Sequence, residues 1–163
     1  MKVVSNTSPL TNLAAIGQFD LLYKLYDEIH IADGVWDELN AFGKSWPGSR
    51  EVAAADWIHR HTVRNQLWVS SLQSDLDRGE SESIVLASEL DVDMILLDEK
   101  AGRNAAMRIQ LKPVGVIGVL LEAKQKCLID IIQPHLDSLR EIAGFRISDS
   151  LYFHTLTLAN EKI

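Results

Sequence analysis

The chain has 163 residues, a length that predicts one domain over residues 1–163. Its net charge of −7 excludes a protein that holds nucleic acid through bulk positive charge. A protein of this net charge can still carry a local basic patch that contacts phosphate groups. The single cysteine excludes an internal disulfide and a thiolate-only metal site, and it fits a reducing cytoplasm. We find no signal peptide and no apolar run of about 18 residues, so we expect a cytoplasmic protein without a membrane span.

Short apolar segments alternate with amphipathic helical segments along the whole chain. The expected strands are 2–4, 29–31, 57–63, 94–97 and 112–116. The expected helices are 10–14, 19–26, 34–42, 52–56, 65–75, 79–90, 102–109, 118–126, a helix that begins at Pro134, and 149–158. Segment 43–49 is rich in turn formers and predicts a loop. This alternation predicts an α/β layer protein with a mostly parallel sheet.

Two of the expected strands differ in their residue pattern. Segment 57–63 alternates apolar and polar residues, which predicts an exposed or edge strand. Segment 94–97 is apolar throughout, which predicts a strand that is buried on both faces.

The run from Gly79 to Glu99 concentrates acidic residues at two places. Glu80 and Glu82 stand where a helix begins, and Asp98 and Glu99 stand where a strand ends. In parallel sheets ligands bind in the crevice at the carboxyl ends of the strands. Carboxylates that gather there repel one another, and a divalent cation would hold them together.

Oxygen-bearing side chains recur where other strands end or helices begin. The full set is Asn6, Glu38, Glu80 with Glu82, and Asp98. Side chains of this kind suit Mg²⁺ or Mn²⁺, and such ions support phosphodiester hydrolysis. Each residue taken alone has an ordinary structural explanation, as a helix cap, a turn residue or an acid at a helix N-terminus. Their joint placement favours a metal site.

Other chemistries have weaker support. His59 and His61 form an H-x-H pair, and that spacing on a strand puts both rings on one face, as a zinc site would need. No cysteine or second histidine pair accompanies them, which favours a surface strand. Ser5 and Ser8 lack a G-x-S-x-G context, and the chain has neither a dinucleotide loop nor a Walker lysine.

The chain resembles PIN-domain proteins, and more narrowly the family DUF3368. The segments that carry the resemblance, in chain order, are VVSNTSPLTNLAAIGQFDLL, VWDEL, GESESIVLASEL, ILLDEKAGR, VGVIGVLLEAK and AGFRIS. Together they run across nearly the whole chain. The resemblance implies a Rossmann-like three-layer α/β/α sandwich with a mostly parallel central sheet.

The resemblance also implies a metal-dependent ribonuclease site of three or four acids that uses Mg²⁺ or Mn²⁺. The second acid would be Glu38, the third Glu80 or Glu82, and the fourth Asp98. The first acid, normally an aspartate after strand one, is matched by Asn6, which keeps a carbonyl ligand but lacks the negative charge.

Three further residues would bind substrate by the same resemblance and placement. Thr7 and Ser8 fit the polar pair that follows the first acid, and Arg103 follows the acidic strand end, where it could meet a phosphate group. The implied function is endoribonuclease action on single-stranded RNA, as the toxin of a toxin–antitoxin pair with a cognate antitoxin protein.

Two alternatives stay open at this point. One is a PIN-fold RNA-binding or protein-interaction module without catalysis, which Asn6 favours. The other is a small phosphohydrolase that uses the same acids. We also expect a homo-oligomer, because tryptophans often anchor interfaces and four of them lie in the middle third of the chain: Trp36, Trp46, Trp57 and Trp68.

Overall fold

The computed structural model describes residues 2–41 and 46–162, and within them a five-stranded sheet forms the centre of the molecule. The strands are β1 (Val3–Ser5), β2 (Ile29–Ala32), β3 (Ile58–His61), β4 (Met94–Leu96) and β5 (Lys112–Val114). All run parallel, in the order β3-β2-β1-β4-β5. The chain thus extends the sheet to one side of β1 and then crosses to the other side. The switch point, where such sheets bind ligands, lies between β1 and β4.

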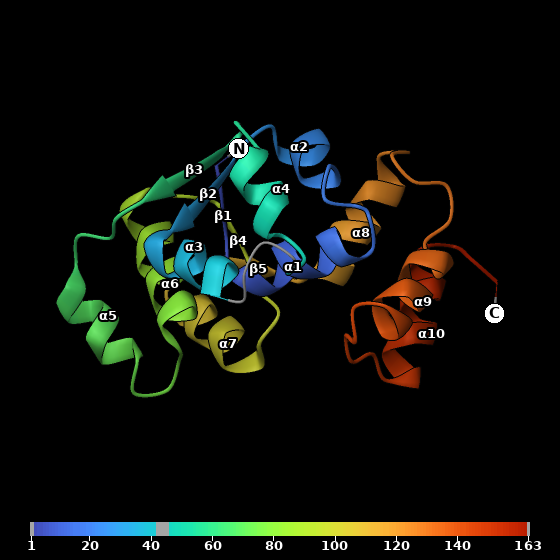
Figure 1. Cartoon of the computed structure of the whole chain (residues 1–163). Helices are drawn as coiled ribbons and strands as arrows, with labels where there is room; N and C mark the ends of the chain where they lie inside the picture. The colour runs from blue at the N-terminus through green and yellow to red at the C-terminus, as the bar shows by residue number, and fades with distance from the viewer. Residues whose placement is uncertain (1, 42–45, 163) are drawn as a thin grey trace.

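Helices cover both faces of this sheet, and Figure 1 shows α5, α6 and α7 together on one side of the molecule, with α9 and α10 at the opposite end. The helices are α1 (Thr7–Ala15), α2 (Leu21–Tyr26), α3 (Asp33–Ala41), α4 (Ser49–Ala54), α5 (Gln66–Leu72), α6 (Arg78–Glu89), α7 (Lys100–Arg108), α8 (Val116–Gln125), α9 (Gln133–Glu141) and α10 (Asp149–Leu158).

The core has two parts because successive strand residues point to opposite faces of the sheet. Val3 of β1 belongs to a cluster with apolar residues of α1, α2, α3, α8, α9 and α10. The next residue, Val4, belongs to a second cluster with residues of α5, α6 and α7. This arrangement is the α/β/α sandwich, so the predicted fold class is confirmed.

The two strand predictions that concern burial are confirmed. Segment 57–63 contains β3, which lies at one edge of the sheet and is only partly buried. Segment 94–97 contains β4, whose residues are buried throughout.

Several predicted helix starts were wrong by two or three residues; α1 starts at Thr7 rather than at residue 10, α2 at Leu21 rather than at 19, and α4 at Ser49 rather than at 52. We expected helices from Gly102 and Gly118, but α7 starts at Lys100 and α8 at Val116. Both positions are inside a helix and yet are glycine, because neighbouring side chains leave no space for a Cβ there. A Cβ on Gly118 would lie 2.8 Å from Val114 Cγ1, for example.

Residues 43–45 of the predicted loop 43–49, and residue 42 of the expected helix 34–42, lie outside the described residues. Of the four tryptophans, Trp36 and Trp57 pack against the first cluster and Trp68 against the second, whereas Trp46 is 45% exposed. None of the helices that the structure describes combines the length and apolar character needed to cross a bilayer.

Candidate functional site

Asn6 and Glu38 come together beside Gly79, in the first turn of α6. Asn6 follows β1 and stands before α1, and Glu38 lies on α3. A Cβ on Gly79 would lie 2.8 Å from Glu38 Oε2 and 3.3 Å from Asn6 Oδ1, so both oxygens face the same small space. Asn6 is buried, and its Oδ1 accepts no hydrogen bond from any residue that the structure describes. A glycine at position 79 keeps this space open.

Glu80 presents a second oxygen without a partner. Its Oε1 accepts a long hydrogen bond from the Asp77 N–H, 3.4 Å, in the capping box that begins α6. Its Oε2 is buried and has no hydrogen-bond donor among the described residues. That oxygen faces Gly102 of α7, where a Cβ would lie only 2.8 Å away. Leaving a buried carboxylate oxygen unpaired costs free energy, so Glu80 Oε2 is poised to bind a cation.

Asp98 lies after β4, one residue beyond Leu97, and is held from two sides. Its Oδ1 accepts the Val116 N–H at the start of α8, at 2.8 Å, and its Oδ2 accepts the Ser8 hydroxyl, at 3.3 Å. A helix N-terminus favours a negative charge, which helps to keep Asp98 in place. Because β1 and β4 are neighbours, Asn6 and Asp98 border the same switch point.

Glu82 is two residues from Glu80 but faces a different environment. Its Oε1 accepts the Gly34 N–H at the start of α3, at 3.0 Å, and its Oε2 accepts the Arg78 Nε–H, at 2.7 Å. Both oxygens of this buried carboxylate are therefore used to join α3 to α6. This geometry favours Glu80 over Glu82 as the third acid.

Two of the three predicted substrate-binding residues, Thr7 and Ser8, hydrogen-bond the acids themselves. The Thr7 hydroxyl donates to Glu38 Oε2 at 2.9 Å, and the Ser8 hydroxyl donates to Asp98. The first turn of α1 therefore links Glu38 to Asp98. Arg103 Nη1 donates to the Leu97 carbonyl at 3.2 Å. Contact of these three residues with substrate stays a prediction.

The acids of the crevice resist ionisation. Burial raises the pKa of Glu80 from 4.5 to about 7, and the charge of Asp77 adds to the shift. Partial burial and the charge of Asp77 also raise the pKa of Glu38, against the opposing Thr7 hydrogen bond. Burial raises the pKa of Asp98 although Val116, Ser8 and Arg103 stabilise its charge. Positive charge supplied to this crevice would stabilise all three carboxylates.

Asp77 belongs to this site, and the sequence reasoning missed it. Its Oδ1 lies 3.6 Å from the position of a Cβ on Gly79, next to Asn6 and Glu38. The same carboxylate accepts the Glu80 N–H at 2.8 Å, as the cap of α6. The signal was present in the sequence, because an acid three residues before a glutamate at a helix start is a capping box.

The residues fit a divalent cation by ligand type and by unfilled hydrogen-bonding capacity. Their donors are all oxygens, which Mg²⁺ and Mn²⁺ prefer, and Asn6 Oδ1 and Glu80 Oε2 are buried without partners in the described chain. Within residues 2–41 and 46–162, however, no three His, Cys, Asp or Glu side chains stand closely enough to hold a metal ion in their present positions. The contacts that the structure gives are separate ones: Asn6 and Glu38 face Gly79, Glu80 Oε2 faces Gly102 and Asp98 Oδ1 faces Gly115.

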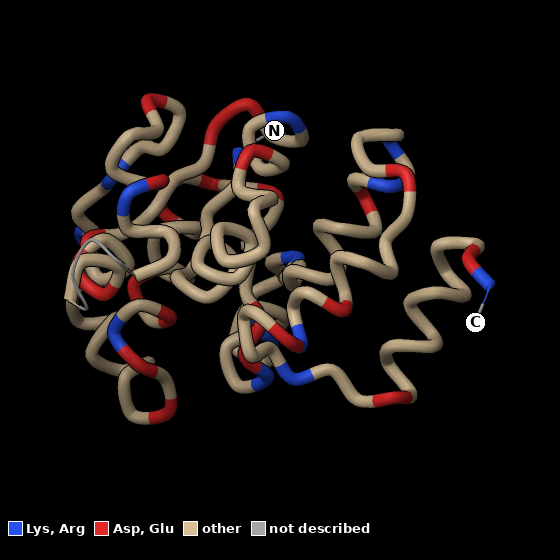
Figure 2. The backbone as a smooth tube through the Cα atoms, turned by 45° about the vertical axis from the view of Figure 1, so that its right-hand side comes forward, with Lys and Arg blue, Asp and Glu red and all other residues tan. Residues whose placement is uncertain are grey.

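A cavity of about 550 Å³ opens directly beside Asp98. Its lining includes Asp98, Arg103, Phe145 and Arg146. Arg146 is exposed and forms no hydrogen bond or ion pair with any residue that the structure describes. Lys and Arg are otherwise interspersed with Asp and Glu along the backbone in Figure 2. The cavity therefore offers a free cation and an aromatic ring next to the acids.

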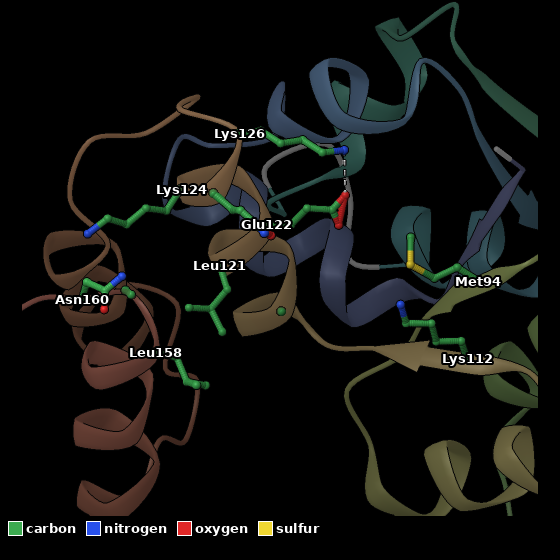
Figure 3. Close-up of a pocket in the computed structure, with 11 residues that line it drawn as sticks. Met94, Lys112, Leu121, Glu122, Lys124, Lys126, Leu158 and Asn160 are labelled. Atoms are coloured by element: carbon green, nitrogen blue, oxygen red, sulfur yellow. Dashed lines mark hydrogen bonds and ion pairs between the residues drawn. The ribbon is translucent and has the colours of Figure 1, made fainter.

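A larger hollow, about 830 Å³, lies elsewhere, along α8 and the end of α10 (Figure 3). Its lining carries several lysines but none of the predicted site residues. Lys126 contacts Glu122 at 3.3 Å, as Figure 3 shows, and Lys124 contacts Glu161 at 2.7 Å. With these two lysines engaged by acids, the hollow is a weaker candidate for an anionic ligand.

A parallel sheet whose switch point is lined by acids and an unpaired amide oxygen defines a class of α/β proteins suited to metal-assisted chemistry. The sequence matches the PIN domain family DUF3368 over residues 2–161, and the chain belongs to that family. PIN domains are generally nucleases and generally bind divalent metals. The predicted family is thus confirmed. No curated protein matches the chain.

Proposed function

We propose that the protein is a divalent-metal-dependent endoribonuclease that hydrolyses phosphodiester bonds in single-stranded RNA. The observation that carries this proposal is the pair of buried, unpartnered oxygens, Asn6 Oδ1 and Glu80 Oε2, at the switch point of the sheet. Glu38 and Asp98 complete the oxygen set around the same crevice. These four residues would hold Mg²⁺ or Mn²⁺.

A bound divalent cation would supply an activated water and would stabilise the charge on the leaving oxygen. The protein's own residues position the acids. Thr7 holds Glu38, Ser8 and the start of α8 hold Asp98, and the capping box fixes the first turn of α6. One of the carboxylates would orient the attacking water.

Single-stranded RNA is the substrate that the neighbouring cavity supports best. Arg146 and Arg103 can meet phosphate groups, and Phe145 offers a face on which an unpaired base can stack. The cavity adjoins Asp98, so a strand bound there would reach the crevice. Arg146 is the stronger phosphate contact, because Arg103 already donates to a backbone carbonyl.

The role of a toxin with a cognate antitoxin protein is part of the same proposal. Exposed apolar side chains on and around the last two helices support a partner surface. They include Ile142, 67% exposed, Leu158, 56%, Phe153, 42%, and Leu151, 41%. Self-association is a further proposal. Of the four tryptophans, Trp46 is exposed and the other three are partly buried.

The test is cleavage of a single-stranded RNA by the purified full chain. We expect cleavage that requires Mn²⁺ or Mg²⁺, stops with EDTA and is lost in Asp98→Asn. The matched control is Asp91→Asn, the same chemical change at an exposed residue with φ +52°, a conformation that asparagine accepts. Activity that survives both EDTA and Asp98→Asn would overturn the proposal.

A PIN-fold RNA-binding module without catalysis is the second candidate, and Asn6 is the observation that favours it. An asparagine lacks the charge that an aspartate would add to the metal site. RNA binding without cleavage in any of these cations, together with loss of that binding in Arg146→Gln, would support this candidate instead.

A further inference from the structure

A cluster of three histidines and one glutamate lies at the β2–β3 edge of the sheet, on strands that do not border the switch point. His30 of β2 pairs in register with His59 of β3, and its other neighbour in that row is Val4 of β1. Their side chains therefore share one face of the sheet. His61 lies two residues after His59 and so projects from the same face. We name Glu28, His30, His59 and His61 the histidine edge.

One carboxylate sits between two imidazole rings in this cluster. Glu28 Oε1 lies 3.3 Å from His30 Nε2, and Glu28 Oε2 lies 3.4 Å from His59 Nε2. The other nitrogen of His30, Nδ1, lies 2.8 Å from His61 Nε2. The ring centroids of His30 and His59 are 5.3 Å apart. The sequence shows only the H-x-H pair, because His30 joins it through strand pairing.

We propose that Glu28, His30 and His59 bind a zinc-type divalent cation, with His61 as a positioning residue. Two histidines and one carboxylate form a ligand set that Zn²⁺ accepts while keeping a position for water. The contact from His61 to His30 Nδ1 has the form of an outer-shell contact, which fixes the orientation of a ligating imidazole. Imidazole nitrogen distinguishes this site from the all-oxygen crevice, which suits Mg²⁺ or Mn²⁺.

Side chains must move on binding, because in residues 2–41 and 46–162 no three His, Cys, Asp or Glu side chains stand closely enough to hold a metal ion in their present positions. Two ligands of one tetrahedral Zn²⁺ lie about 3.3 Å apart, given bonds of about 2.0–2.1 Å. The contacts of Glu28 with the two histidines have nearly this length, but the groups are hydrogen-bonded to one another and do not yet surround a point. The side chains of Glu28 and His59 are 46% and 45% exposed, so they can turn toward a cation, while His30, at 10%, stays fixed.

The bound cation would join the edge strand β3 to β2. β3 pairs with one neighbour only within the described sheet, and Glu28 immediately precedes β2. A ligand that binds the folded state and not the unfolded chain raises stability by mass action. We therefore expect Zn²⁺ to raise the thermal midpoint of the protein independently of nuclease activity.

The experiment is a titration of the full chain, free of any polyhistidine tag, with Zn²⁺ by calorimetry and with Co²⁺ by visible absorption. We use Asp98→Asn as the background, so that binding in the crevice is weakened. We expect one equivalent of Zn²⁺ per chain at the histidine edge and the intense bands of Co²⁺ with nitrogen ligands in a low coordination number. His59→Gln and Glu28→Gln should each weaken binding at least about tenfold.

Matched controls are His135→Gln and His154→Gln, which change histidines outside the cluster and should leave binding intact. His61→Gln should weaken binding less than His59→Gln, since it acts through His30. Unchanged Zn²⁺ affinity and an unchanged Co²⁺ spectrum in both His59→Gln and Glu28→Gln would show a hydrogen-bonded network only and overturn the proposal. Absence of any Zn²⁺ binding in the folded background protein would do the same.

Discussion

The crevice and the histidine edge lie on the same sheet and satisfy their polar groups in opposite ways. In the crevice, Asn6 Oδ1 and Glu80 Oε2 are buried without partners in the described chain, and Asp77 adds like charge. At the histidine edge, Glu28 is shared between two histidines and remains half-exposed. Oxygens without hydrogen-bond partners attract a hard cation strongly. At the histidine edge, a cation must instead replace existing hydrogen bonds.

Residues of the same type differ in the same way within the crevice itself. Glu80 and Glu82 share a helix and similar burial, 7% and 5% exposed. Both carboxylate oxygens of Glu82 accept hydrogen bonds, from Gly34 and Arg78, whereas Glu80 Oε2 accepts none from the described residues. We therefore propose that the unpaired oxygen, rather than acidity or burial, distinguishes Glu80 as the metal-binding residue of the two.

The largest expected effect is the difference in Mn²⁺ affinity and RNA cleavage between Glu80→Gln and Glu82→Gln. Glu80→Gln removes a charge that faces the crevice, so we expect Mn²⁺ affinity and RNA cleavage to fall by more than the roughly 10–100-fold that follows loss of an outer-shell contact. Glu82→Gln should reduce activity far less. Calorimetric Mn²⁺ titration and cleavage rates of both variants give the comparison, and equal losses would erase the distinction between filled and unfilled acids.

In their effect on stability the two glutamates should differ in the opposite direction, with Glu82 the more important. Glu82→Ala leaves the buried Gly34 N–H without its acceptor, so we expect the free energy of unfolding to fall by about 1–3 kcal/mol. Glu80→Ala removes a buried carboxylate with one unpaired oxygen, whose other oxygen accepts only a 3.4 Å hydrogen bond, so it should cost less stability than Glu82→Ala. Denaturant unfolding in EDTA measures both, and a Glu80→Ala protein less stable than Glu82→Ala would contradict the assignment.

Much of this architecture was accessible from the sequence because it depends on local patterns. The apolar run 94–97 predicted the buried strand β4, and the alternation in 57–63 predicted the edge strand β3. Acids at helix starts and strand ends predicted Glu38, Glu80 or Glu82, and Asp98 as site residues, a prediction that did not include Asp77. These features are short-range in the chain, and parallel strands then bring their carboxyl ends together.

What the sequence could not provide depends on contacts between distant segments. Spacing could not separate Glu80 from Glu82, because the distinction comes from Gly34, 48 residues away. The role of Gly79 as an opening beside Asn6 and Glu38 also requires three elements to meet. His30 could not be joined to His59 until the strands were paired.

Asn6→Asp changes the charge of the crevice and leaves the histidine edge unchanged. A carboxylate at position 6 adds a charged ligand beside Glu38, so we expect Mg²⁺ or Mn²⁺ to bind roughly tenfold more tightly, since ligand charge tunes divalent affinity. Without metal the same variant should be less stable than the wild type because of repulsion. Calorimetry with Mn²⁺ measures the gain, and Asn160→Asp, the same chemical change at an exposed residue after α10 with φ +58°, is the control. An unchanged affinity would favour the non-catalytic module.

The smallest expected effect is a pH dependence whose sign differs between the two regions. The pKa of Glu80 is raised to about 7, so between roughly pH 4.5 and 7 the folded protein keeps a proton that the unfolded chain has lost. In EDTA, stability should therefore rise as pH falls from 8 to 6. Burial lowers the pKa of His30 and His61, so their contribution is lost as pH falls below about 6.5.

The thermal midpoint should consequently pass through a maximum near neutral or mildly acidic pH. Glu80→Gln removes the titrating group in the crevice, so it should flatten the rise between pH 8 and 6 while leaving the acid-side fall, to which His30 and His61 contribute. His61→Gln should instead reduce that fall. Thermal scans of the three proteins at half-unit pH steps measure both limbs. If the rise in thermal midpoint between pH 8 and 6 is unchanged in Glu80→Gln, Glu80 does not hold a proton at neutral pH. Burial and the charge of Asp77 then do not raise its pKa as described.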